Sequence, residues 1–320
     1  MDEDDARAAG DGVLACAYHP DRAALLRCTR CESPICADDA IDAPVGYQCR
    51  RCAEGGQPVR RLVDAGAAPL TKALVITVAV IFVATELGRR TGLDVIPILG
   101  LRPVALAADG PAMLEAILGA AAPASFTTPV GQPWLLVTSA LLHANLMHVA
   151  FNGLLLWQLG GMLEPTLGRG RFAALTAAGA AGGGLGVTFL AWAGVVTGLA
   201  GAGIGDLLGA NPFVTTVGAS GAVFGLMGAA MVGMRHRGID PWRTGIGGLV
   251  ILNLVLTFAI PAVSVGGHLG GLVGGAVAGR LLFVERSRAR AATRRVWVIT
   301  AAMLVASVLL ANLTVASLFG

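Results

Sequence analysis

The chain after residue 70 consists largely of apolar runs that are too long for the core of a soluble domain. Seven such runs are predicted, at about 70–88, 134–162, 172–198, 216–234, 244–263, 266–284 and 296–318. Each is near the roughly 20 residues that a helix needs to cross the hydrocarbon core of a bilayer. Only 13% of the residues are charged, against about 25% in an average soluble domain. The chain is therefore predicted to be an all-α polytopic membrane protein.

Basic residues gather in alternate loops between these runs, at 169–171, 235–243 and 286–295. Cytoplasmic loops are enriched in Lys and Arg, so the pattern predicts a multi-pass protein of the plasma membrane with a cytoplasmic N-terminus and an external C-terminus. Arg89, Arg90 and Arg102 depart from this rule. The net charge of +3 reflects these loops and predicts no nucleic-acid partner. The acidic start of the chain carries no sign of a cleavable signal peptide.

Composition divides the chain into six segments. We expect a disordered acidic N-terminus at 1–15, a cysteine-rich module at 16–53, a basic linker at 54–69, a helical core at 70–284, a basic cytoplasmic loop at 285–295 and a seventh transmembrane helix at 296–320. The cysteines lie only in the second of these segments, which separates their chemistry from that of the membrane part.

Three polar clusters interrupt the apolar runs at one predicted depth, near the outer face. Ser220 lies in a Gly-Ala-Ser-Gly segment at the start of the fourth run, and His268 follows Gly267 at the start of the sixth. His148 and Asn152, four residues apart on one face of the second run, form the third cluster. Polar groups in hydrocarbon are costly and tend to mark function. The agreement of three separate clusters therefore predicts an intramembrane site.

The chemistry of these side chains predicts acyl transfer by a serine. Ser220 is a weak nucleophile unless a base takes its proton, and His268 is the candidate base because histidine titrates near neutral pH. We identify no carboxylate at this depth to orient the imidazole, so a dyad is predicted rather than a triad. The side-chain donors of His148 and Asn152 suit the negative charge of a tetrahedral intermediate. Phe224, one turn after Ser220, is expected to pack against the imidazole.

Glycines frame both halves of this site. They recur at intervals of three or four residues, at 221, 225 and 228 in the fourth run and at 267, 270, 271, 274 and 275 in the sixth. Faces of this kind let membrane helices approach closely. Gly218, Gly221 and Gly271 are therefore predicted to support the site by bringing Ser220 and His268 together.

These motifs resemble the rhomboid family of intramembrane serine proteases. The resemblance covers about residues 70–284 and rests on three segments: Gly-Ala-Ser-Gly at 218–221, His-Ala-Asn-Leu-Met-His-Val-Ala-Phe-Asn at 143–152, and Gly267-His268 followed by Gly271 and Gly275. Together they are highly specific, whereas the first motif alone would be weak. The resemblance implies a six-helix core with one additional C-terminal helix.

The resemblance also implies a role for each site residue. Ser220 is the expected nucleophile and His268 the expected general base, with no cofactor for catalysis. The Ser220 backbone N–H, His148 and Asn152 are the expected oxyanion hole. The implied substrates are transmembrane proteins, cleaved within or beside their transmembrane segments.

Two positions depart from the family pattern. Trp134 is followed by Leu135 where many members have Trp-Arg, and Phe224 stands where many have tyrosine. The second change keeps the aromatic ring, and neither touches the dyad, so activity is still expected. Glu164, at a matching family position after the second run, is expected to be structural. His143 is also expected to be structural rather than catalytic.

The six cysteines belong to four pairs of metal-ligand type, each with two intervening residues: Cys16 and His19, Cys28 and Cys31, Cys36 and Asp39, and Cys49 and Cys52. This spacing suits tetrahedral zinc, and the pattern resembles zinc domains of the B-box type. We expect structural zinc on two interleaved sets, the first and third pairs forming one and the second and fourth the other. Because Asp39 stands where cysteine is more usual, a single zinc on the four-cysteine set stays open. Metal should supply much of the folding energy of so short a module.

Two other functions stay open on the sequence alone. A non-catalytic rhomboid-like binder of client membrane proteins is disfavoured by the intact serine and histidine. A transporter would show internal repeats and polar residues at mid-membrane, neither of which we find. The zinc module is placed across the membrane from Ser220 by the predicted topology, so it is expected to bind a cytosolic protein partner or to regulate, not to catalyse.

Overall fold

The computed structural model describes residues 14–29, 31–42, 47–54, 68–108, 131–201, 203, 205, 208–260, 263–284 and 289–319. The chain divides into two compact units, Met1–Leu62 and Val63–Gly320. The expected acidic N-terminus and basic linker lie largely outside the described residues, as does the first part of the loop expected at 285–295.

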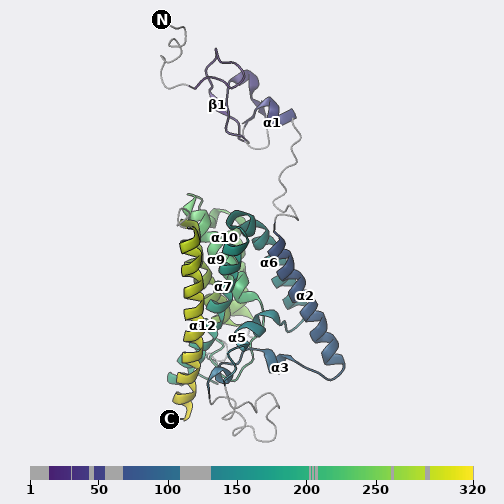
Figure 1. Ribbon diagram of the computed structural model, residues 1–320, viewed down its shortest axis with the longest axis vertical. Helices are drawn as coiled ribbons and strands as arrows, with labels where there is room; N and C mark the ends of the chain where they lie inside the picture. The colour runs from purple at the N-terminus through teal and green to yellow at the C-terminus, as the bar shows by residue number, and fades with distance from the viewer. Residues whose placement is uncertain are drawn as a thin grey trace. The chain divides into compact units, whose positions relative to one another are not determined.

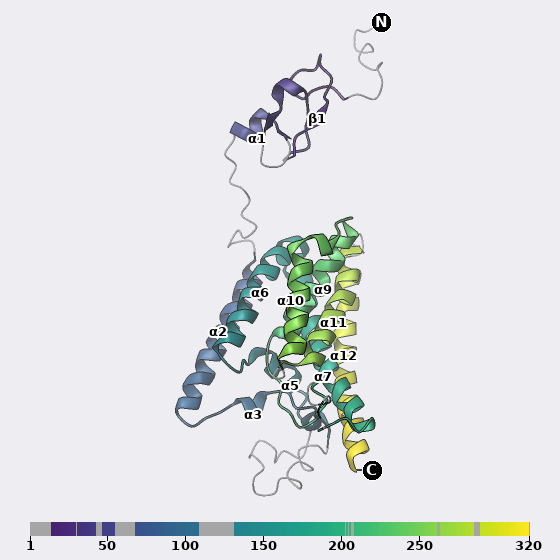
Figure 2. The ribbon, with the colours of Figure 1, turned by 180° about the vertical axis from the view of Figure 1, so that it is seen from behind.

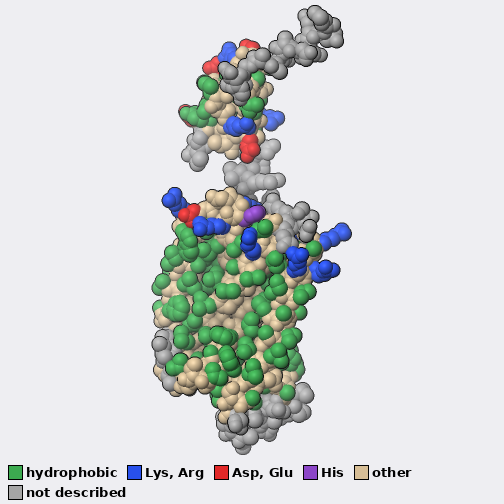
Figure 3. Space-filling view, turned by 90° about the vertical axis from the view of Figure 1, so that its left-hand side faces the viewer, with side chains coloured by type: hydrophobic (Ala, Val, Ile, Leu, Met, Phe, Trp, Pro, Cys, Tyr) green, Lys and Arg blue, Asp and Glu red, His purple; other side chains and the backbone are tan. Residues whose placement is uncertain are grey.

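Long helices dominate the described part of the second unit. They are α2 (Pro69–Arg90), α6 (Leu146–Leu167), α7 (Arg169–Val196), α9 (Ser220–His236), α10 (Gly245–Ala259), α11 (Val265–Val284) and α12 (Ala289–Phe319). By length and composition, α2, α6, α7, α11 and α12 can each cross a membrane. Hydrophobic side chains spread over the face of this unit drawn in Figure 3, while Lys and Arg gather at one end. The predicted all-α polytopic membrane fold is confirmed.

The centre of this unit is built on direct contact between helix backbones. Helix α11 packs against both α7 and α9, and α12 packs against α7 (Figures 1 and 2). A Cβ on Gly275 would lie 2.0 Å from the backbone oxygen of Gly225 on α9, and one on Gly270 would lie 2.2 Å from that of Gly182 on α7. No side chain fits at such distances, so only glycine permits this packing. The close approach expected of the fourth and sixth spans is confirmed.

The second predicted span, 134–162, is wrong at its start. Its first part forms the short helix α5 (Leu135–Thr138) and the 3-10 turn η6 (Ser139–Leu141), and α6 begins only at Leu146. Asn145 caps α6, because its side-chain oxygen accepts a hydrogen bond from the backbone N–H of His148 at 2.9 Å. The sequence did not predict this break, because hydropathy averaged over many residues changes little with a single polar cap such as Asn145.

The last helix also begins earlier than predicted. Helix α12 starts at Ala289 rather than at residue 296, so the second part of the expected basic loop is helical. Alanine and arginine are strong helix formers. An apolar run ends at the first charged residues, whereas the helix continues through Arg290, Arg294 and Arg295.

A buried carboxylate ties α2 to α6. Glu164, which is 2% exposed, accepts hydrogen bonds from the backbone N–H of Leu70 at 2.9 Å and of Thr71 at 2.7 Å, and from the Thr71 hydroxyl at 2.8 Å. These N–H groups lie in the first turn of α2, where they have no partner within the helix. Negative charge is also favourable at a helix N-terminus. Glu164 thus has a structural role, as expected.

The connection after α2 packs against the last helix. It includes α3 (Ile96–Leu99) and the buried 3-10 turn η3 (Pro103–Leu106), which shares a hydrophobic cluster with α12. The backbone N–H of Ala108 donates to Asn312 Oδ1 on α12 at 3.2 Å. The last helix therefore supports this connection in addition to packing on α7.

The described part of the first unit holds short hairpins, the 3-10 turn η2 (Ala37–Asp39) and one α-helix. Strand β1 (Leu26–Arg27) pairs antiparallel with β2 (Pro34–Ile35), β3 (Ile41–Asp42) pairs with β4 (Tyr47–Gln48), and the helix α1 spans Arg50–Glu54. Among the residues described there, the hydrophobic cluster has three fully buried members, Cys28, Ile35 and Cys49. A core of this size calls for additional stabilisation, such as a bound metal.

Candidate active site and metal centre

Ser220 is the first residue of α9, and neighbouring elements hold the turn that precedes it. Gly218 has a φ of 133°, a value that favours glycine, and its N–H donates to the backbone oxygen of Ser139 at 2.9 Å. The N–H of Ala219 donates to His143 Nε2 at 3.4 Å. His143 therefore supports the backbone beside Ser220, in keeping with the structural role expected of it.

His148 packs against the same turn. A Cβ on Gly218 would lie 2.7 Å from His148 Nε2 and 3.7 Å from Ser220 Oγ, so glycine leaves one small volume between these two side chains. Asn152, which is 5% exposed, lies one turn further along α6, and its Nδ2 donates to the backbone oxygen of His148 at 3.1 Å. The structure thus brings His148 to Ser220, while one amide hydrogen of Asn152 is used within its own helix.

His268 lies in the first turn of α11, where α9 and α10 both reach it. The Phe224 ring stacks on the imidazole, with centroids 4.0 Å apart and an angle of 22° between the planes. Thr257 Oγ1, on α10, lies 2.7 Å from His268 Nδ1. A Cβ on Gly271 would lie 2.2 Å from the backbone oxygen of Gly221, so α9 and α11 touch beside the site. The packing expected of Phe224 and of these glycines is present.

Ser220 and His268 extend from these two contacting helices. Among the described residues, no hydrogen bond of 3.5 Å or less joins the Ser220 hydroxyl to the imidazole. Catalytic pairs are often looser before substrate binds and tighten in the complex. The arrangement therefore places the two groups on adjacent helices without yet joining them.

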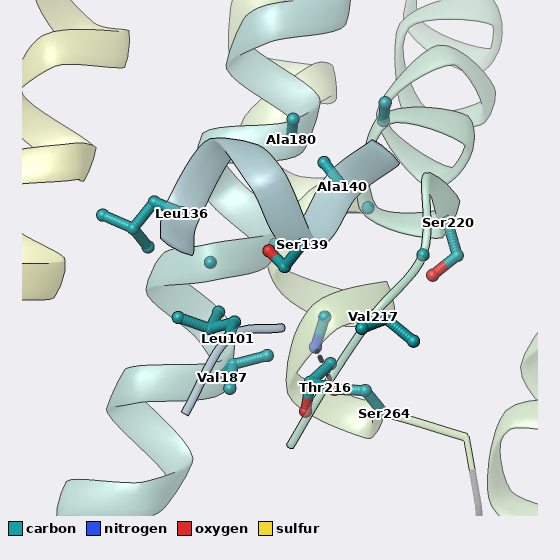
Figure 4. Close-up of a pocket in the computed structure, with 16 residues that line it drawn as sticks. Leu101, Leu136, Ser139, Ala140, Ala180, Val187, Thr216, Val217, Ser220 and Ser264 are labelled. Carbon is teal, nitrogen blue, oxygen red and sulfur yellow. Dashed lines mark hydrogen bonds between the residues drawn. The ribbon is translucent and has the colours of Figure 1, made fainter. Parts of the chain in front are cut away.

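A cavity of about 40 Å³ opens beside Ser220. Ser139, Val217 and Ser264 reach its wall from separate elements, as Figure 4 shows. Glycine backbone of α7 and α11 forms another part of the lining. A cavity of this volume suits a small side chain better than an aromatic one.

Cys28, Cys31, Cys49 and Cys52 converge in the first unit. Their sulfur atoms all lie within 4.8 Å of one another, and those of Cys31 and Cys49 are 3.7 Å apart. A Zn–S bond of about 2.3 Å places tetrahedral thiolates about 3.8 Å apart. The hydrogen bond with the Ser33 side chain is the main cause that lowers the pKa of the Cys31 thiol to about 6, which favours the thiolate that binds metal. This group can hold a metal ion.

Cys16, His19, Cys36 and Asp39 form a second such group, whose ligand atoms also lie within 4.8 Å of one another. The Asp39 carboxylate is buried, and its Oδ2 lies 2.7 Å from His19 Nδ1. Its other oxygen lies 3.1 Å from Arg50 Nε. An outer partner of this kind orients a ligating carboxylate. The structure thus collects the predicted ligands in the two interleaved sets that were expected.

Three contacts in these sites have no motif in the sequence: those of Thr257, Ser139 and Arg50. Each acts on a site residue from a different element, so its position depends on packing. A threonine in an apolar helix ordinarily bonds back to its own backbone. The sequence pattern around Thr257 therefore did not predict a contact with His268. The available signal was that Asn253 and Thr257 are polar, four residues apart and on one face of an otherwise apolar helix.

Comparison with known proteins gives a consistent family. A family model for the rhomboid domain matches residues 130–285. The rhomboid protease GluP of Bacillus subtilis (strain 168) is 32% identical over 163 residues, which is 50% of this chain and 28% of GluP. Rhomboid-like protease 1 of Toxoplasma gondii is also 32% identical over 163 residues, with 47% of each chain covered. YdcA of Bacillus subtilis (strain 168) is 30% identical over 161 residues, which cover 49% of this chain and 71% of YdcA. The chain thus spans less than half the length of the first two relatives.

Proposed function

This chain belongs to the rhomboid family, and we propose that it is an intramembrane serine protease that hydrolyses peptide bonds in or beside transmembrane segments. The observation that carries the proposal is the placement of Ser220 on the wall of a cavity, at the N-terminus of the helix whose Phe224 stacks on His268. The relatives named as proteases support the same activity. They do not favour the alternative, a non-catalytic binder of client membrane proteins.

The proposed reaction follows from the chemistry of these groups. Ser220 Oγ attacks the peptide carbonyl carbon while His268 takes the hydroxyl proton. The carbonyl oxygen becomes an oxyanion, stabilised by the Ser220 backbone N–H, His148 and Asn152. His268 then gives its proton to the leaving amine, which breaks the C–N bond and leaves an acyl-enzyme. Water, with His268 again as base, releases the acid and restores Ser220.

The cavity beside Ser220 supports a preference for small substrate side chains. Its volume of about 40 Å³ and its glycine-rich lining favour a small side chain over an aromatic one next to the cleaved bond. We therefore propose that peptides with alanine or serine at the substrate residue that enters this cavity are cleaved faster than those with leucine or phenylalanine.

For the first unit we propose two structural zinc ions, one in each ligand group. The short distances between the ligand atoms of each group support this assignment, as does the small hydrophobic cluster of the unit. When bound, zinc would crosslink the hairpins and helix of the unit. Ser33 favours the thiolate of Cys31, and Arg50 favours the carboxylate of Asp39. The comparisons do not support the cytosolic partner that was expected of this module, so the proposal is limited to a structural role.

We further propose that the protein lies in the plasma membrane with a cytoplasmic N-terminus and an active site that opens toward the outer face. The gathering of Lys and Arg at one end of the face drawn in Figure 3 supports this topology. Ser220 is the first residue of α9 and His268 lies in the first turn of α11, whereas Arg235 lies in the last turn of α9 and Arg237 follows that helix.

Labelling with a fluorophosphonate probe tests the proposed function directly. We expect the detergent-purified wild type to be labelled, and Ser220→Ala and His268→Ala to lose the label. Ser307→Ala is the matched control, because Ser307 is a buried serine on α12 that bonds only back to Met303 of its own helix in the described structure. A folded wild type that takes no label, or a label that persists in Ser220→Ala, would reject the proposal.

A further inference from the structure

Helix α10 contributes one buried polar side chain to the candidate site. The residues of α10 that are buried are Gly247, Val250 and Thr257, and of these only Thr257 carries a polar side chain. Thr257 is 1% exposed, and its Oγ1 lies 2.7 Å from His268 Nδ1. The hydroxyl therefore contacts Nδ1 of the imidazole and not Nε2.

The same hydroxyl makes a second short contact, 2.7 Å from the backbone oxygen of Asn253. A carbonyl oxygen can only accept a hydrogen bond, and a hydroxyl has one proton to donate. Both contacts are hydrogen bonds only if Thr257 donates to Asn253 and accepts from an N–H at His268 Nδ1. A neutral imidazole that carries its proton on Nδ1 has its lone pair on Nε2.

We propose that Thr257 is a positioning residue that fixes His268 in the tautomer protonated at Nδ1, so that Nε2 is free to accept the Ser220 proton. Its effect on rate rests on the proposed protease function, whereas its effect on the tautomer does not. In soluble serine hydrolases a carboxylate supplies this orientation. A carboxylate would be costly in hydrocarbon, while a threonine hydroxyl satisfied by its own helix is not.

Thr257 and Phe224 restrain the imidazole in complementary ways. The stacked Phe224 ring covers one face of the imidazole and limits its tilt. The Thr257 hydrogen bond fixes which edge faces α10, because a flip of the ring would exchange Nδ1 for a carbon atom. The orientation of the base is thereby set by two helices, α9 and α10, that flank α11.

A kinetic comparison of Thr257→Val and Thr257→Ser tests the effect on rate. Valine keeps the shape and removes the hydroxyl, and we expect kcat for a transmembrane substrate to fall about tenfold with KM unchanged. Serine restores the hydroxyl and should recover most of the rate. Thr300→Val is the matched control, since Thr300 is also buried and bonds back to Val296 within its helix but contacts no histidine in the described structure. A loss that serine does not recover, or an equal loss in Thr300→Val, would overturn the proposal.

Nitrogen-15 NMR of side-chain-labelled histidine tests the tautomer without any substrate. The chain has five histidines, and the His268 signals are identified by their loss in His268→Ala. We expect the proton on Nδ1 in the wild type and in Thr257→Ser, and a shift toward Nε2–H in Thr257→Val. An Nε2–H tautomer in the wild type would overturn the inference, as would an unchanged tautomer in Thr257→Val. If the wild type cleaves nothing, the proposed function fails and this measurement alone decides the role of Thr257.

Discussion

The Phe224 ring lies flat against the His268 imidazole, with centroids 4.0 Å apart and planes inclined by 22°. Phe224 is 2% exposed and lies one turn after Ser220 on α9, so the stack connects the proposed base to the helix that carries the proposed nucleophile. Thr257 holds the edge of the same imidazole from α10. In the described structure the imidazole of the proposed dyad thus contacts an aromatic face and a hydroxyl.

Replacing Phe224 should affect the rate of the chemical step. We expect Phe224→Leu to lower kcat about tenfold, because an aromatic pair contributes about 0.5–1.5 kcal/mol beyond its buried area and about 1.4 kcal/mol corresponds to a factor of ten. Phe224→Tyr keeps the ring and should stay near the wild-type rate. The measurement is kcat and KM on a transmembrane substrate, with thermal unfolding of each variant as the control for folding. Equal rates in Phe224→Leu and the wild type would contradict an orienting role for the ring.

The contact between Gly275 and Gly225 should tolerate no side chain. A Cβ on Gly275 would lie 2.0 Å from a backbone oxygen, which cannot move aside as a flexible side chain could. We expect Gly275→Ala to lower the free energy of unfolding by about 1–3 kcal/mol, as overpacking does. Gly153→Ala is the control, because a Cβ there meets nothing within 4 Å and alanine favours a helix. A Gly275→Ala variant as stable as the wild type in thermal unfolding would show that α9 and α11 do not pack in this way.

Metal analysis of the purified full chain should find two zinc ions per chain. We expect Asp39→Ala and Cys28→Ser each to lose one, since the two residues belong to different ligand groups. Asp38→Asn is the matched control, because Asp38 adjoins Asp39 but belongs to neither group. One zinc in the wild type, unaffected by Asp39→Ala, would reject the site that contains aspartate.

Zinc binding by the four-cysteine group should weaken on acidification. The pKa of the Cys31 thiol is lowered to about 6, first of all by its hydrogen bond with the Ser33 side chain. A lowered pKa keeps the thiolate present at neutral pH, and its contribution to metal binding is lost as the pH falls through and below that value. We expect Ser33→Ala to release zinc at a higher pH than the wild type, as measured with a chromogenic chelator across a pH series. Coincident release curves would remove Ser33 from this role.

The sequence alone predicted the class of fold and the chemistry of the site. Apolar runs of membrane length and polar residues within them are local properties, because hydrocarbon penalises every unsatisfied polar group wherever the chain folds. The small-residue faces around Gly221 and Gly271 likewise predicted that the fourth and sixth spans approach, since only glycine permits backbone contact. The spacing of the cysteine pairs predicted the two ligand groups in the same way.

Only the tertiary structure placed α6 at Leu146 and brought Thr257 to His268. The first depends on Asn145, a single cap that an average over apolar residues does not detect. The second joins residues on different helices, and its geometry is set by how α10 packs on α11. The pairing of Arg50 with Asp39 is of the same kind. The sequence pattern thus specified which groups must leave water and which could react. The partners of those groups were decided by packing, because contacts between different elements follow no periodicity along the chain.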